Sequence, residues 1–130
     1  MPRRVEDWVK QAEKDLKHAR NSIECRDYEW ACFAAQQASE KILKALYQSL
    51  GGEPYGHSLT KLIRDLPKEI KPDNEMIKAG MELDKFYIPT RYPNGFDSGS
   101  PMDYYSVEDA KKAVEYAEHI FSFIKTQIRK

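Results

Sequence analysis

The sequence lacks the features of membrane, secreted and metal-binding proteins. No apolar run approaches the roughly 20 residues of a membrane-spanning helix, and Met1–Trp8 contains no apolar signal-peptide core. The two cysteines, Cys25 and Cys32, are too far apart for a CxxC motif, and no other cysteine could complete a zinc site. We therefore expect a soluble cytoplasmic protein without a metal or other cofactor, and we expect Cys32 to be a small core residue.

The chain also lacks an excess of charge. Its 130 residues include 21 Lys and Arg and 21 Asp and Glu, so the formal net charge is zero. This balance argues against a protein that coats nucleic acid or anionic membranes nonspecifically, although a local basic cleft is compatible with it. The length suits one domain, which we expect to span residues 1–130.

Motifs of nucleophilic catalysis and of regular phosphate loops are absent. There is no Gly-x-Ser-x-Gly elbow and no glycine-rich phosphate loop. The segment Asp97–Asp103 is rich in Asp and Ser, but its spacing fits no EF-hand, and Gly99 and Pro101 are typical of turns. No segment has the signal of a β-strand of useful length.

Apolar residues recur at three- and four-residue steps over most of the chain, which predicts amphipathic helices. The predicted helices are Val5–Glu24, Tyr28–Ser49, Leu59–Leu66, Glu75–Phe86 and Val107 to the C-terminus. The second has an apolar seam of Trp30, five alanines, Ile42 and Leu46, and the alanines make it narrow enough for a neighbouring helix to approach closely. Four or five such helices with mostly short connections predict an all-α, up-and-down bundle.

The long predicted loop Tyr87–Tyr105 contains one arginine among aromatic residues. Pro89 and Pro93 keep this region from being helical, so Arg91 is expected on a stiff loop. An arginine fork beside stackable rings suits phosphate and base recognition. Asp84, Tyr87, Arg91 and Tyr92 could share one pocket wall, or Arg91 could pair with Asp84 or another carboxylate and fix the loop.

Two further groups of polar residues are candidates for function. One is a polar stripe on the second predicted helix, which either faces a cleft or partner or is a solvated face with local ion pairs. Its members are Gln36, Gln37, Glu40, Lys41 and Lys44. His57 could be an acid–base group or a phosphate donor, or its ring could pack and satisfy a backbone carbonyl. His18 and His119 are expected at the surface or in a helix seam.

Three motifs in this order give the chain a resemblance to a known family. They are Gln36-Gln37-Ala38-x-Glu40-Lys41, Gly56-His57-Ser58-Leu59 and Thr90-Arg91-Tyr92-Pro93. Together with landmarks from Trp8 to Ala117, they resemble HEPN domains, small helical proteins of higher eukaryotes and prokaryotes.

This resemblance implies a helical bundle that commonly forms homodimers. Prokaryotic members are often encoded beside a minimal nucleotidyltransferase and serve as its partner subunit, and they are similar to the substrate-binding helical domain of larger nucleotidyltransferases. Many HEPN proteins are metal-independent ribonucleases of toxin–antitoxin systems, with an Arg-x(4–6)-His motif paired across the dimer. This sequence departs from that motif, because no arginine has a histidine four to six residues beyond it.

The resemblance and the loop composition together predict a noncatalytic module that binds a nucleotide or similar phosphorylated ligand and supports a nucleotidyltransferase. Arg91 would contact the phosphate, and Tyr87 and Tyr92 would stack or shape the pocket. The further candidate contacts are Asp84, His57, Lys41 and Lys44. One alternative is a divergent metal-independent HEPN ribonuclease of the toxin type, in which His57 replaces the missing histidine. Another is a purely structural dimerisation or antitoxin-type partner.

Overall fold

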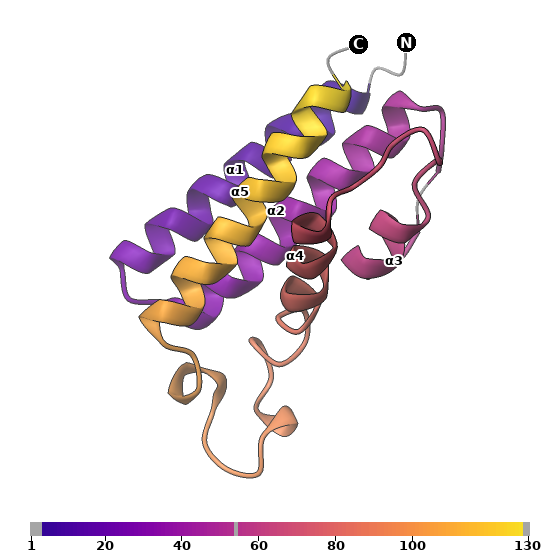
Figure 1. Ribbon diagram of the computed structural model, residues 1–130. Coiled ribbons are helices and arrows are strands. Elements are labelled where there is room, and N and C mark those ends of the chain that lie inside the picture. The colour runs from indigo at the N-terminus through magenta and orange to yellow at the C-terminus, as the bar shows by residue number, and fades with distance from the viewer. Residues whose placement is uncertain (1–3, 54, 129–130) are drawn as a thin grey trace.

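The computed structural model describes residues 4–53 and 55–128. Its five α-helices are α1 (Arg4–Glu24), α2 (Tyr28–Ser49), α3 (Leu59–Arg64), α4 (Asn74–Asp84) and α5 (Val107–Ile128), and the described residues include no strand. The helices α1, α2 and α5 lie side by side, and α1 and α4 run opposite to α2 and α5 (Figure 1). The prediction of an all-α, up-and-down bundle is confirmed.

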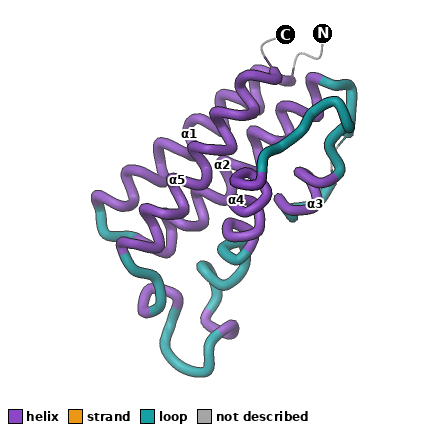
Figure 2. The backbone as a smooth tube through the Cα atoms, viewed as in Figure 1, coloured by secondary structure: helices purple, strands orange, loops and turns teal. Residues whose placement is uncertain are grey.

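The connection between α4 and α5 projects beyond the end of the bundle, at the opposite end from the two termini (Figures 1 and 2). It contains two short 3-10 turns, Pro93–Gly95 and Pro101–Asp103, and is otherwise irregular. The long loop expected between the fourth and fifth helices is therefore present. None of the helices in the described part of the chain is long and apolar enough to cross a membrane.

The core is built around α2, which packs against both α1 and α5. All five alanines of the predicted seam are buried, so their small side chains let the neighbouring helices approach closely. Trp30 was also expected in this seam, and that expectation is wrong, because the residue is 46% exposed. Its indole instead lies edge-on against Phe33, since a gap sized for alanine methyl groups has no room for an indole.

Cys32 is a buried core residue on the same helix, as predicted. Burial, with smaller contributions from the charges of Asp109 and Glu29, raises the pKa of its thiol to about 12. The thiolate, which is the reactive form, is therefore disfavoured at neutral pH.

Helix ends follow the capping residues of the sequence. Ser58 Oγ caps α3 by accepting from Lys61 N at 3.1 Å, and Asp73 Oδ1 and Ser106 Oγ cap α4 and α5 by accepting from Met76 N and Asp109 N. The helices α3 and α4 each end two residues before the predicted C-terminal residue, at Arg64 and Asp84.

Asp84 ties the end of α4 to the start of α3. Its carboxylate accepts hydrogen bonds from Leu59 N at 2.7 Å, from Thr60 N at 3.0 Å and from Thr60 Oγ1 at 2.6 Å. The first N–H groups of a helix have no partner within the helix, so this side chain satisfies donors of α3 that would otherwise be unpaired. A short helix such as α3 depends on such contacts for its stability.

We expect Asp84→Ala to lower the free energy of unfolding by about 2 kcal/mol, because it removes a charged acceptor from several N–H and O–H donors. Chemical denaturation monitored by circular dichroism measures this change. The matched control is Glu82→Ala, which removes a carboxylate of the same helix that forms only an exposed pair with Lys85. Equal stability of the two variants would contradict the capping role of Asp84.

Candidate functional site

Arg91 is held at the centre of an aromatic cluster. The guanidinium carbon lies 4.3 Å from the ring centre of Phe33, 4.8 Å from that of Tyr87 and 5.2 Å from that of Tyr92. In addition, Arg91 Nε and Nη2 donate hydrogen bonds to the carbonyl oxygen of Tyr87 at 2.9 and 2.6 Å. Cation–π contacts and these hydrogen bonds thus fix the orientation of the guanidinium.

The backbone around Arg91 is anchored as well. Thr90 is buried, and its Oγ1 donates a hydrogen bond to Phe86 O at 2.6 Å. Arg91 N donates to Ile88 O at 3.1 Å, so the chain makes a hydrogen-bonded turn here, with Pro89 inside it. Arg91 is therefore presented by a fixed turn, as expected from the sequence.

No carboxylate of the described residues forms an ion pair with Arg91. The alternative of a pair with Asp84 fails, because that carboxylate caps α3. The guanidinium has more N–H groups than the two that bind the carbonyl of Tyr87. The side chain is half-buried, and its remaining donors can bind an anion such as a phosphate.

His57 contacts the same cluster through Tyr87. The two rings stack with their centres 4.6 Å apart, and His57 Nδ1 lies 3.0 Å from Glu40 Oε2. A carboxylate only accepts, so Nδ1 is the donor in this pair, while Nε2 has no hydrogen-bond partner among the described residues. The side chain is 53% exposed, so Nε2 is available to a ligand.

Glu40 is a buried carboxylate that holds His57 in place. It is 5% exposed and lies 2.9 Å from Lys44 Nζ, while Gln36 Nε2 donates to its second oxygen at 3.2 Å. A buried charge needs such partners, because leaving it unpaired would cost several kcal/mol. The solvated-face alternative for the polar stripe is therefore wrong for Gln36 and Glu40.

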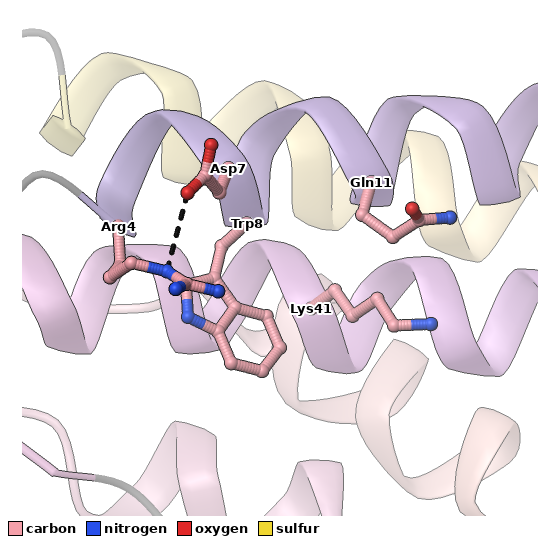
Figure 3. Close-up of a pocket in the computed structure, with 5 residues that line it drawn as sticks. All are labelled: Arg4, Asp7, Trp8, Gln11 and Lys41. Atoms are coloured by element: carbon pink, nitrogen blue, oxygen red, sulfur yellow. Dashed lines mark ion pairs between the residues drawn. The ribbon is translucent and has the colours of Figure 1, made fainter.

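Lys41 lies in a different environment. It pairs with Asp15 of α1 at 2.5 Å and lines a hollow between α1 and α2 together with Arg4, Asp7, Trp8 and Gln11 (Figure 3). In this hollow Arg4 pairs with Asp7 at 3.2 Å, so both of its cations are already neutralised by carboxylates.

The structure thus brings four of the predicted site residues together, namely Arg91, Tyr87, Tyr92 and His57. Lys44 is linked to them through Glu40. Lys41 and Asp84 have other partners. Sequence reasoning missed Phe33, on which the guanidinium rests. The available signal was a large aromatic residue beside an alanine-rich seam. The described residues include no group of three or more His, Cys, Asp and Glu side chains that could hold a metal ion.

Three solved structures are similar to this chain over nearly its whole length. The crystal structure of TT1696 from Thermus thermophilus has a TM-score of 0.95 and 40% sequence identity, covering 98% of this chain and 99% of that one. The crystal structure of ST0689, an archaeal HEPN homologue, has a TM-score of 0.83 and 41% identity, covering 97% and 98%. The HEPN domain protein tm0613 from Thermotoga maritima has a TM-score of 0.78 and 33% identity, covering 95% and 98%.

A more distant relative has a name that refers to function. The protein Putative toxin MJ1304 of Methanocaldococcus jannaschii is 25% identical over 127 residues, which cover 91% of this chain and 84% of that protein. The family model of the HEPN domain matches residues 5–127. The resemblance inferred from the sequence motifs is confirmed, and this chain belongs to the HEPN domain family.

Proposed function

We propose that this chain is a noncatalytic HEPN module that binds a nucleotide or a similar phosphorylated ligand through Arg91. The observation that carries the proposal is a guanidinium oriented by three aromatic rings and a carbonyl but paired with no carboxylate of the described residues. If Arg91 served only to fix the loop through an ion pair, a carboxylate would lie beside its guanidinium.

The neighbouring side chains fit this role. Tyr92 is 49% exposed beside the guanidinium and offers a ring on which a ligand could stack. Tyr87 connects Arg91 to His57, so a phosphate on the outward donors of Arg91 would lie near a second polar group. Lys41 and Lys44 are already paired with Asp15 and Glu40 and are the weaker candidates for direct contact.

We also propose that the module forms a homodimer and is the partner subunit of a minimal nucleotidyltransferase. The resemblance to nucleotidyltransferase-associated members of the family supports this.

Isothermal titration calorimetry with ATP, GTP and the other common nucleotides tests the ligand proposal. We expect Arg91→Ala to weaken binding by roughly 10- to 100-fold, because it removes charge-assisted hydrogen bonds to the phosphate. The matched control is Arg20→Ala, which removes an arginine that pairs with Glu118 between α1 and α5. Absence of nucleotide binding, or binding that Arg91→Ala leaves unchanged, would refute the proposal.

A second candidate function is toxin-type RNA cleavage, favoured by the relative that is named a toxin and by the pairing of His57 with Glu40. In this reaction His57 Nε2 would accept the proton of a ribose 2′-hydroxyl while the 2′-oxygen attacks the adjacent phosphorus. The bond to the 5′-oxygen would break, with water supplying its proton, and a 2′,3′-cyclic phosphate would form. Arg91 would stabilise the charge that develops on the phosphate.

An RNA-cleavage assay in the presence of EDTA distinguishes the two functions. From the noncatalytic proposal we expect no cleavage by the purified chain. Metal-independent cleavage that is lost in His57→Ala but retained in His18→Ala would replace the first proposal by the second. Copurification with a nucleotidyltransferase without any nucleotide affinity would instead favour a purely structural partner.

A further inference from the structure

An open hollow lies directly beside Arg91. It is lined by Glu29 and Trp30 from the start of α2 and by Thr90, Arg91, Ser100, Pro101 and Met102 from the long loop. We propose that this hollow holds the base of the nucleotide, an inference that rests on the proposed nucleotide binding at Arg91. Trp30 is the surface on which the base stacks. Glu29 is the group that selects bases with an amino substituent.

Trp30 has the exposure and the fixed orientation of a stacking surface. Its indole is 46% exposed and lies edge-on to Phe33, with ring centres 6.2 Å apart. The ring centre of Phe33 in turn lies 4.3 Å from the Arg91 guanidinium carbon, so one aromatic ring orients both side chains. A phosphate on Arg91 would place the remainder of the nucleotide next to the open indole, where a base can stack.

Glu29 supplies a hydrogen-bond acceptor in the same hollow. It is half-buried and forms no ion pair with any described residue, including the Arg91 that lines the hollow with it. Glu29 lies in the first turn of α2. An unpaired carboxylate accepts hydrogen bonds from the amino groups of adenine, cytosine and guanine, whereas uracil has no amino group.

The part of the lining that comes from the long loop, Ser100, Pro101 and Met102, lies at the short turn Pro101–Asp103. Ser100 N donates to Asp103 Oδ2 at 2.9 Å and the Ser100 side chain accepts from Asp103 N, which together close a capping box around the turn. The hollow is therefore lined by the cation of Arg91, the indole ring of Trp30 and the carboxylate of Glu29. A nucleotide presents phosphate, a flat base and base-edge amino groups, and this set of groups matches it.

The experiment uses calorimetry with CMP, UMP, AMP and ribose 5-phosphate on the full chain. We expect CMP to bind more tightly than UMP, because the two bases differ at the position that carries the amino group in cytosine. Glu29→Gln should remove this preference. Trp30→Ala should weaken AMP binding roughly tenfold or more while leaving the binding of ribose 5-phosphate unchanged. The control is Trp8→Ala, which alters the chain's other tryptophan, in α1, and should change the binding of neither compound.

Tryptophan fluorescence provides a direct measure of stacking. In Trp8→Phe the only remaining tryptophan is Trp30, and we expect AMP to quench its emission. In Trp30→Phe the remaining tryptophan is Trp8, and its emission should not respond. This pair of conservative variants keeps the test valid if Trp30→Ala fails to fold.

The outcomes separate this inference from the proposal on which it rests. If ribose 5-phosphate binds as tightly as AMP, or if CMP and UMP bind equally, the base site is refuted while phosphate binding at Arg91 stands. If neither nucleotides nor ribose 5-phosphate bind to the unaltered chain, the proposed function itself fails. If Trp30→Ala abolishes only self-association, the hollow is an interface with a second copy and the base site is wrong.

Discussion

The contact between Arg91 and Tyr87 is the interaction on which the candidate site depends. The carbonyl oxygen of Tyr87 accepts hydrogen bonds from two nitrogens of the guanidinium. The Tyr87 ring contacts both the guanidinium and the imidazole of His57. A carbonyl is neutral, so it orients the arginine without cancelling its charge. An anion can then bind the remaining donors at a lower entropic cost, because the side chain is already ordered.

The helix α2 provides a different set of residues on each of its faces. One face is the alanine seam that packs against α1 and α5. Another carries Gln36, Glu40 and Lys44, and the buried carboxylate of Glu40 orients His57 from this face. The first turns carry Phe33, which supports Arg91. A single helix thus connects the core to the candidate site, so substitutions in the seam are expected to disturb the site indirectly.

The sequence predicts the parts of the structure that depend on local physics. Helix periodicity and the proline-stiffened turn at Arg91 both depend on residues that are close in the chain. Side chains whose position depends on distant partners were not predicted. Asp84 accepts hydrogen bonds from the start of α3, and Glu40 pairs with His57, seventeen residues later in the chain. Trp30 is excluded from the seam by the closeness of the neighbouring helices.

The central claim is that the free donors of Arg91 bind a phosphate while its bonds to Tyr87 stay in place. A crystal structure of the chain with bound AMP tests this most directly. We predict a phosphate within hydrogen-bond distance of the Arg91 guanidinium, with Nε and Nη2 still donating to the carbonyl of Tyr87. AMP bound elsewhere, with Arg91 paired to a carboxylate of a second copy, would contradict the account.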